Sequence, residues 1–394
     1  MLATSKNTKQ TSIMFDDILS GIRRLHNQPE GFIPLHAPVF NGNEKKYVNQ
    51  TIDSTFVSSV GEFVVQFEEM MKQITGAKYA IAIVNGTCAL HLALVLAGVE
   101  YNDEVITQPL TFVATANAIA HANAIPHFVD VDKDSLGLSP SKLKAHLEQI
   151  AVIKDGKCYN KITNRRIGAC VPMHTFGMPM RIDEVVAVCK QYNIPVVEDS
   201  TESIGAYYKE KHTGTYGLLG TFSFNGNKTI TCGAGGAIIT NDDALGKKAK
   251  HLSTTAKIPH AWAFEHDVVA YNYRMPNLNA ALACAQLEQL SAFVDDKRDL
   301  AQSYQQSFSS LPVTVINEIP SAKANYWLCG LLFKDGKEKE EFLAYSNGKQ
   351  VMTRPAWQLM NRLPMYKDCF KGDISNAEWL EERIVNIPSS VRLK

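Results

Sequence analysis

The hydrophobic pattern of the chain is most regular between residues 79 and 200, where short apolar segments alternate with helical ones. The apolar segments are continuously hydrophobic, which is typical of strands that are buried on both faces of a sheet. These predicted strands are residues 79–84, 104–109, 125–131, 168–174 and 195–200. The helices predicted between them are residues 86–98, 111–122, 139–150 and 182–192. The alternation predicts an α/β fold with a doubly wound, mostly parallel sheet.

The pattern changes near residue 220, where two strands, Gly220–Phe224 and Ala237–Thr240, are separated by a polar and Gly-rich turn. We expect this pair to be an antiparallel addition to the sheet. The sheet region between residues 79 and 241 then holds about seven strands.

The segments on either side of the sheet predict three parts of the chain. Residues 1–12 are polar and are expected to be a disordered tail, and Phe15–Leu25 predicts a short helix from its apolar spacing. Further helices are predicted at 44–54, 61–75, 276–292 and 295–308, and short strands at 313–316 and 327–333. We therefore expect a tail with a short helix (1–31), a large domain (32–275) and a smaller α+β C-terminal domain (276–394).

The composition agrees with two domains and excludes several classes of protein. The length of 394 residues exceeds one typical core, and 45% apolar with 20% charged residues is typical of a soluble protein. Basic and acidic residues both total 40, so no overall charge favours nucleic acid or an anionic membrane. Neither a membrane span nor a secretory signal is recognisable. Eight cysteines without a CxxC pair indicate free thiols, so we expect a cytoplasmic protein that binds neither nucleic acid nor membranes.

Polar residues that follow the predicted strands are candidates for chemistry, because ligands of open α/β sheets bind at the carboxyl ends of the strands. Asn85-Gly86-Thr87-Cys88 follows the first strand and opens a helix, which suits an anion, although a plain N-cap explains it equally. Phe112 follows the second strand and either stacks on a planar ring or belongs to the core.

A buried strand ends in Glu198 and Asp199, and a carboxylate there needs a partner. A cationic ring nitrogen, an arginine or a capped helix would serve. Lys228 lies in the turn after Ser223, among small residues and two phenylalanines. Desolvation lowers a lysine's pKa and makes its amine a nucleophile, although an ordinary loop lysine is the alternative.

Together, an anion site, an aromatic ring, an aspartate and a lysine are what pyridoxal phosphate requires. Other cofactors fit less well. The Gly-rich segment Cys232–Gly236 lacks the GxGxxG spacing and leads into a strand, and no lysine completes a P-loop after Gly86. His121 and His127 are not at metal-ligand spacing, and no metal site is expected.

The sequence resembles the DegT/DnrJ/EryC1/StrS family, the fold-type I aminotransferases that act on nucleotide-linked 4-keto sugars. The resemblance extends from about residue 32 onward and depends on five ordered segments. These are NGTCALHLAL (85–94), QPLTFVATANAI (108–119), VVEDSTESIGA (196–206), FSFNGNKTITCGAGG (222–236) and YNYRMPNLNAALACAQLEQL (271–290). It implies that residues 32–275 form the pyridoxal-phosphate-binding domain.

The resemblance also implies roles for single residues. Lys228 would bind the cofactor covalently and act as the base for the 1,3-proton shift, and Asp199 would pair with the pyridine nitrogen. Glu202 would lie near the ring hydroxyl, where many members carry His or Gln. The other implied cofactor contacts are the ring of Phe112, the helix start at Gly86 and Thr87, the backbone of Cys88, and Ser223. Asn272 looks like a residue that a neighbouring subunit donates to the phosphate, which implies a homodimer with shared active sites.

Three stretches look most like enzymes that make precursors of legionaminic and related nine-carbon sugars, namely residues 15–25, 32–68 and 353–366. The implied reaction moves an amino group from L-glutamate to C4 of a nucleotide-linked 2-acetamido-2,6-dideoxy-4-hexulose. Pyridoxamine phosphate and 2-oxoglutarate form in the first half-reaction. The alternative is another keto sugar, such as an 8-keto octulosonate or a perosamine-type precursor. The carrier, UDP or GDP, stays open.

The substrate is expected to contact the late segment and the loop at 32–43. Arg354 and Arg362 suit a diphosphate, with Trp357 and Tyr366 for stacking or packing, although a basic helix face is the alternative. His36 is expected to reach the sugar.

Two rival functions are considered on the same fold. A sugar 3-dehydratase of this family replaces the cofactor-binding lysine with histidine, and Lys228 argues against it. A non-enzymatic member would tolerate loss of the lysine or the aspartate, and both are present. An aminotransferase is therefore expected.

Overall fold

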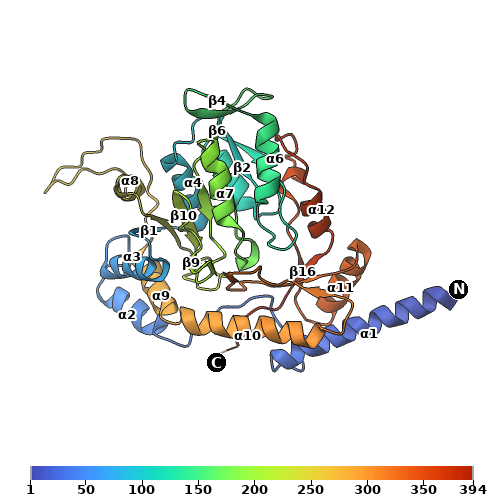
Figure 1. The fold of residues 1–394 in the computed structure, drawn as a ribbon. Helices are drawn as coiled ribbons and strands as arrows, with labels where there is room; N and C mark the ends of the chain where they lie inside the picture. The colour runs from blue at the N-terminus through green and yellow to red at the C-terminus, as the bar shows by residue number, and fades with distance from the viewer. Residues whose placement is uncertain (1, 393–394) are drawn as a thin grey trace.

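The computed structural model describes the chain from Leu2 to Arg392, with side chains from Ile13 onward. Its helices are α1 (Leu2–Leu25), α2 (Glu44–Asp53), α3 (Glu62–Thr75), α4 (Gly86–Leu96), α5 (Val113–His121), α6 (Pro140–Ile150), α7 (Ile182–Gln191), α8 (Asp243–Ser253), α9 (Asn277–Leu287), α10 (Leu290–Phe308), α11 (Gly336–Gly348) and α12 (Ser375–Glu381). Figure 1 shows α3, α4, α7 and α8 beside strands of a central sheet, whereas α1 and α11 lie at the other end of the molecule, near β16.

The central sheet has seven strands in the order β1-β11-β10-β7-β6-β2-β3. They are β1 (Tyr79–Ile83), β2 (Glu104–Thr107), β3 (Ile125–Phe128), β6 (Ile167–Val171), β7 (Val197–Asp199), β10 (Leu219–Ser223) and β11 (Gly236–Thr240). Isolated parallel bridges, such as Cys170 to Val196, join β6 to β7. Only β11 runs against its neighbours. The predicted α/β fold, with an antiparallel pair at residues 219–240, is confirmed.

The sheet is covered on both faces, which explains why its strands are continuously apolar. In β1, Ala80 and Ala82 pack with α3 and α9, whereas Ile81 and Ile83 pack with α4 on the other face. Successive side chains of a strand point to opposite faces, so burial on both faces requires apolar residues at every position.

The C-terminal part forms a second, antiparallel sheet in the order β12-β14-β16-β15. Its strands are β12 (Thr314–Val315), β14 (Cys329–Leu332), β15 (Arg354–Pro355) and β16 (Ile384–Ile387). A two-stranded sheet is formed by β4 (Ala151–Lys154) and β5 (Lys157–Asn160). A three-stranded sheet in the order β13-β8-β9 is formed by β8 (Tyr207–Tyr208), β9 (Lys211–His212) and β13 (Ala322–Lys323).

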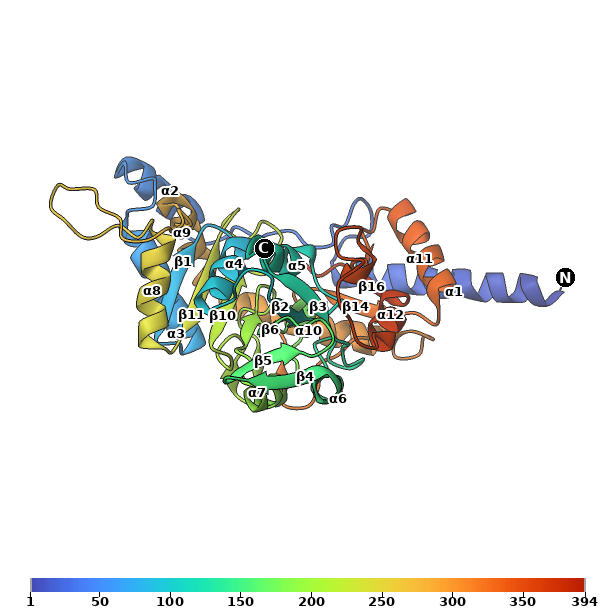
Figure 2. The same ribbon diagram turned by 90° about the horizontal axis from the view of Figure 1, so that it is seen from above.

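The long helix α10 links the two sheets. Phe293 and Val294 belong to the core under the central sheet, whereas Leu300 and Tyr304 belong to the core of the C-terminal part. Figure 2 shows α10 beneath the central sheet, seen from above. The domain boundary near residue 276 stays a prediction, because this helix packs into both cores.

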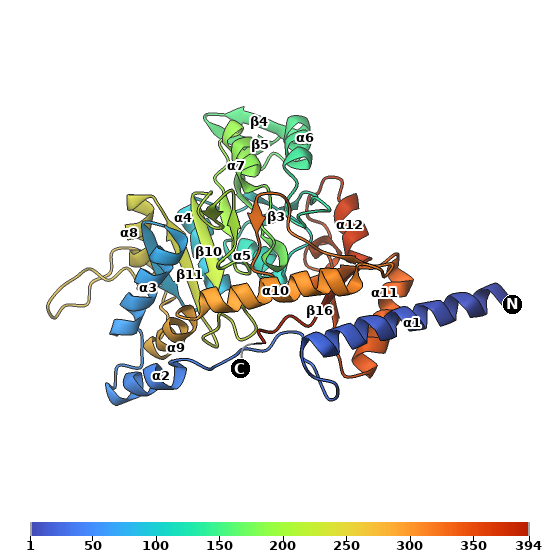
Figure 3. The ribbon, with the colours of Figure 1, turned by 60° about the horizontal axis from the view of Figure 1, so that its bottom comes forward.

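The prediction for the N-terminal residues was wrong. Residues 1–12 were expected to be a disordered tail, but α1 begins at Leu2 and continues without a break to Leu25. Residues 2–12 contain no proline or glycine that would stop the helix. The buried residues Phe15, Ile18 and Ile22 anchor α1 in the C-terminal core, beside α10 and α11 (Figure 3). No helix in the described part of the chain is both long and apolar enough to cross a membrane.

Candidate active site

A cavity of about 440 Å³ opens at the carboxyl ends of the central strands, a size typical of small-ligand sites. The strands β1, β2, β7 and β10 all run in one direction, so the residues that follow them meet at one edge of the sheet. Seven of the predicted site residues line this cavity: Gly86, Thr87, Phe112, Asp199, Glu202, Ser223 and Lys228.

Lys228 is held in the turn that follows β10. Its backbone N–H donates to the carbonyl of Asn225 at 3.0 Å, and the residue is only 9% exposed. The Nζ atom lies 3.0 Å from Oε1 of Glu202 and 3.8 Å from the ring centroid of Trp327. A carboxylate and an aromatic face thus take the place of water around the amine.

Asp199 is a buried carboxylate that is hydrogen-bonded by two threonines. Its Oδ2 accepts a hydrogen bond from Thr115 Oγ1 at 2.7 Å, and its Oδ1 accepts from Thr201 Oγ1 at 2.7 Å. No lysine, arginine or histidine nitrogen among the described residues comes within 4.0 Å. The arginine that the sequence left open is therefore not there, and the carboxylate suits a cation in the cavity.

Glu198, the neighbour of Asp199, stabilises the loop at residues 214–217 and does not face the cavity. Its carboxylate accepts backbone N–H groups from Gly214, Tyr216 and Gly217 at 2.8, 2.5 and 2.6 Å. Because successive residues of β7 point to opposite sides, only Asp199 faces the cavity.

The start of α4 lies beside Ser223 at the edge of the cavity. The side chain of Asn85 caps the helix by accepting the N–H of Cys88 at 2.8 Å. That N–H is therefore already paired, and Cys88 does not line the cavity. The N–H groups of Gly86 and Thr87 have no acceptor within the helix. A Cβ atom at Gly86 would lie 2.7 Å from the Cβ of Ser223, so glycine is required for this close approach.

The carboxyl of Glu202 is almost fully buried. Burial raises the pKa of Glu202 to about 7, against the lowering effect of Lys228, and Asp199 raises it further. Its Oε2 accepts the N–H of Phe176 at 2.8 Å. The group therefore exchanges its proton close to neutral pH.

Among the cavity residues that the sequence analysis missed, three contact Asp199 or Lys228. Thr115 had a usable signal, because it stands one helical turn after Thr111 at the start of the helix that follows β2. Trp327 had no signal in the sequence, because it lies in the C-terminal part and reaches the cavity only through the packing of that part. Thr201 lies two residues after Asp199 and caps its carboxylate. Trp357, which was expected to stack or pack, lines the cavity 6.0 Å from the ring of Phe112.

Four other predicted residues lie outside this cavity, namely His36, Asn272, Arg354 and Arg362. His36 has both ring nitrogens buried and without a hydrogen-bond partner among the described residues. Burial, with Lys297 and then Lys228, lowers the pKa of His36 well below its usual value. Asn272 is exposed, and its side chain accepts the Nε–H of Arg274 at 2.9 Å.

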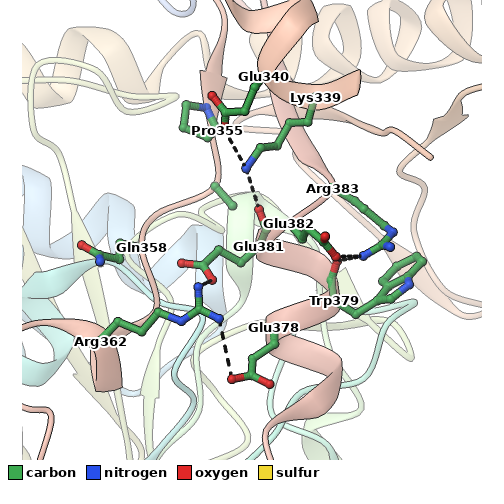
Figure 4. A pocket seen from close by; sticks show the side chains of 11 residues that line it. Lys339, Glu340, Pro355, Gln358, Arg362, Glu378, Trp379, Glu381, Glu382 and Arg383 are labelled. Carbon is green, nitrogen blue, oxygen red and sulfur yellow. Dashed lines mark hydrogen bonds and ion pairs between the residues drawn. The ribbon is translucent and has the colours of Figure 1, made fainter. Parts of the chain in front are cut away.

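Arg354 and Arg362 do not line the cavity that holds Lys228. Arg362 lines a separate cavity of about 710 Å³, shown in Figure 4. Its guanidinium lies 2.6 Å from Glu381 and 3.6 Å from Glu378. Arg354 donates to Asn347 at 3.3 Å. Between the two arginines, Trp357 lines the cavity of Lys228, whereas its neighbours line the other cavity. The contact of Arg354 and Arg362 with a diphosphate stays a prediction.

The cavity has the chemistry that pyridoxal phosphate needs. The N-terminus of α4 with Ser223 suits the phosphate, and Asp199 lacks a cation that a protonated ring nitrogen would supply. Lys228 is buried within the same cavity. Fold and site together define a pyridoxal-phosphate-dependent enzyme of fold type I.

Comparison with known proteins gives the family. Residues 39–394 match the DegT/DnrJ/EryC1/StrS aminotransferase family, to which this chain belongs. GDP-perosamine synthase of Escherichia coli O157:H7 is 37% identical, over 91% of this chain and 93% of that protein. GDP-perosamine synthase of Vibrio cholerae is 33% identical, over 91% and 94%. The solved structure of Helicobacter pylori PseC, an aminotransferase involved in the biosynthesis of pseudoaminic acid, shares the fold, with a TM-score of 0.81 at 23% identity and coverage of 91% and 94%.

The expected class is thereby confirmed. The chain is a pyridoxal-phosphate-dependent nucleotide-sugar aminotransferase. The expected specificity for a legionaminic-type precursor does not follow from these relatives.

We predict that Glu202 makes stability depend on pH. Its folded-state pKa, about 7, is above the ordinary 4.5, so its contribution is fully present below the ordinary value. This contribution is lost as the pH rises through the folded pKa. The free energy of unfolding of wild type should therefore fall, relative to Glu202→Gln, between about pH 5 and about pH 8 in urea titrations.

Glu210→Gln is the matched control, because Glu210 also lies 3.0 Å from a lysine but its side chain is 80% exposed. It should show no such difference. Equal pH profiles for wild type and Glu202→Gln would contradict the prediction.

Proposed function

We propose that the enzyme transfers the amino group of L-glutamate to C4 of a nucleotide-linked 2-acetamido-2,6-dideoxy-4-hexulose. The product would serve the biosynthesis of a legionaminic-type or related surface sugar. One observation carries the aminotransferase chemistry, namely a buried lysine and a cation-free aspartate that line one cavity. Eight free thiols support a reducing compartment, and we place the enzyme in the cytoplasm.

In this proposal the residues of the cavity divide the work on the cofactor. When bound, pyridoxal phosphate supplies an electron sink that makes the proton on the carbon next to nitrogen removable. Asp199 would keep the ring nitrogen protonated, and Phe112 would stack on the ring. Thr87 and Ser223 would hold the phosphate at the start of α4. Lys228 would hold the cofactor covalently, and its Nζ would serve as the base for the proton shift.

Glu202 is the proposed proton partner of Lys228. Its Oε1 lies within hydrogen-bond distance of Nζ, and its pKa near 7 lets it hold or release a proton during turnover. Trp327 covers Nζ from the C-terminal side and limits access of water.

His36 is the proposed contact for the sugar. Two buried ring nitrogens without partners are costly unless a ligand or water pairs with them. The lowered pKa keeps the imidazole neutral, so it offers one donor and one acceptor to sugar hydroxyl or carbonyl groups.

A perosamine-type precursor linked to GDP is the second candidate substrate. Its support is the identity of 37% and 33% with two GDP-perosamine synthases along nearly the whole chain. The two candidates differ in the carrier nucleotide and in the acetamido group, so a substrate screen separates them.

We also propose a homodimer in which Asn272 of one subunit reaches the cofactor phosphate of the other. The loop after α8 projects from the body at the left of Figure 1 and ends near Asn272. Trp262 and Phe264 in this loop are 82% and 81% exposed. Phe56 and Val65, around α3, are also exposed and line or border an apolar cavity. Exposed apolar side chains of this kind are typical of a protein interface.

We predict that Lys228→Ala abolishes transamination and removes the visible absorbance of bound cofactor, because no other amine of the cavity replaces Nζ. Absorbance spectra before and after addition of glutamate measure this, and circular dichroism checks the fold. Lys323→Ala, at an exposed lysine, is the control and should behave as wild type. Turnover retained by Lys228→Ala would refute the role of Lys228.

A screen of UDP- and GDP-linked 4-keto sugars, with glutamate as donor and NMR of the product at C4, tests the substrate. We expect the 2-acetamido-2,6-dideoxy-4-hexulose to have the highest kcat/KM. A preference for the GDP-linked perosamine precursor would replace the first candidate by the second. Reaction of neither sugar would refute both.

Shared sites predict complementation between two defective variants. Lys228→Ala and Asn272→Ala, co-expressed with different tags, form hybrids with one intact site per dimer. Half of the dimers in an equal mixture are hybrids, so about a quarter of wild-type activity should return. Hybrids no more active than their parents would show that each site is built from one chain.

A further inference from the structure

Asn325 connects both groups that contact the amine of Lys228. It lies between β13 and β14 and is completely buried. Its Nδ2 donates to the carbonyls of Glu202 and Ile204, at 2.9 and 2.8 Å. Its Oδ1 accepts the N–H of Trp327 at 2.9 Å. One side chain thus fixes the backbone at Glu202 and at Trp327.

These two residues hold Lys228 from different sides. The Oε1 of Glu202 is 3.0 Å from Nζ, and the ring of Trp327 lies over the same atom at 3.8 Å. The indole Nε1–H also donates to the carbonyl of Asn227 at 2.6 Å, which fixes the turn directly before Lys228.

Two bulky residues beside the same contact have positive φ angles. Phe176 and Tyr326 have φ angles of 58° and 48°, which is unfavourable for bulky residues. Phe176 uses this conformation to direct its N–H to Oε2 of Glu202, at 2.8 Å. The backbone N–H of Asn325 donates to the carbonyl of Gly177, and that of Leu328 to Phe176, both at 3.3 Å.

Gly177 confirms how closely the two segments fit. Its φ is +85°, and a Cβ atom there would lie 1.8 Å from Oδ1 of Asn325. The helix α10 holds the other side, because Lys297 donates to the carbonyl of Trp327 at 3.3 Å and Arg298 to that of Ala324 at 2.9 Å. Contacts with Gly177 and with α10 therefore hold the segment that contains Asn325 from two sides.

We propose that Asn325 is a positioning residue for the reactive lysine, acting through Glu202 and Trp327. Asn325 keeps water away from the carboxyl of Glu202 and holds the indole of Trp327 over Nζ. Its own hydrogen bonds go to backbone groups and not to the amine. The inference rests on the proposed role of Lys228, but its test uses the full chain free of cofactor, so it does not depend on turnover.

The first measurement follows protonation of Glu202 by infrared difference spectra against pH, with the carboxyl band assigned by its loss in Glu202→Gln. Lys228 and Asp199 are the charged groups that act on this carboxyl. Wild type should titrate near pH 7. In Asn325→Ala water reaches the carboxyl, so its midpoint should fall by about one pH unit or more towards the ordinary value.

Asn160→Ala is the matched control. Asn160 is also completely buried, donates to a carboxylate, Glu104, at 2.9 Å, and accepts a backbone N–H at 2.9 Å, but it lies far along the chain in the hairpin strand β5. It should lower thermal stability and leave the midpoint of Glu202 unchanged. An unchanged midpoint in Asn325→Ala, or an equal shift in Asn160→Ala, would overturn the proposal.

The second measurement is labelling of Lys228 by trinitrobenzenesulfonate, read by peptide mass spectrometry. Loss of the Trp327 cover should raise labelling several-fold in Asn325→Ala and leave it unchanged in Asn160→Ala. If Asn325→Ala does not fold, Asn325→Ser replaces it, since serine lacks the two amide N–H donors and its hydroxyl is on a shorter side chain. It should shift both readouts in the same direction, and wild-type values in folded Asn325→Ser would overturn the proposal. Absence of aminotransferase activity in wild type would instead overturn the proposed function alone.

Discussion

The removal of Lys228, Glu202 and Asp199 from water is the constraint on which the rest of the site depends. A buried charge is tolerated only where hydrogen bonds or an opposite charge replace its hydration. Each of the three has such a replacement: the carboxyl of Glu202 for the amine, a backbone N–H for Glu202, and two threonine hydroxyls for Asp199. Among the described residues, no positive charge balances Asp199, which faces the cavity. The protonated ring nitrogen of the cofactor would supply that charge.

The parallel sheet is what makes this arrangement possible. Residues more than a hundred positions apart, such as Thr87 and Ser223, meet because their strands end at the same edge. The two segments then need only short turns to bring an anion site and a lysine together. The reversed strand β11 follows the lysine turn and returns the chain through the sheet, which clamps that turn between two paired strands.

Much of the fold and of the cofactor side of the site was predictable from the sequence. Continuous apolar runs indicated the buried strands, and the residues after them indicated the cavity. Trp327 was not predictable, because its place over Lys228 depends on how the C-terminal sheet packs. Asn325 lacked a signal for the same reason, since its partners, Glu202 and Ile204, are distant in sequence. The cavity that Arg362 lines was not predictable either, because a run of basic and aromatic residues does not show which of two neighbouring cavities each side chain enters. The continuation of α1 to Leu2 was missed because a polar composition does not by itself stop a helix.

The helix α10 has a consequence for the way the protein unfolds. Its first half is part of the core below the central sheet, and its second half is part of the core that also holds α1. Neither core keeps its packing when the other melts, because both lose the same helix. The two sheets are therefore joined into one cooperative unit, and a fragment cut near residue 276 would leave the lysine-bearing sheet without one wall of its core.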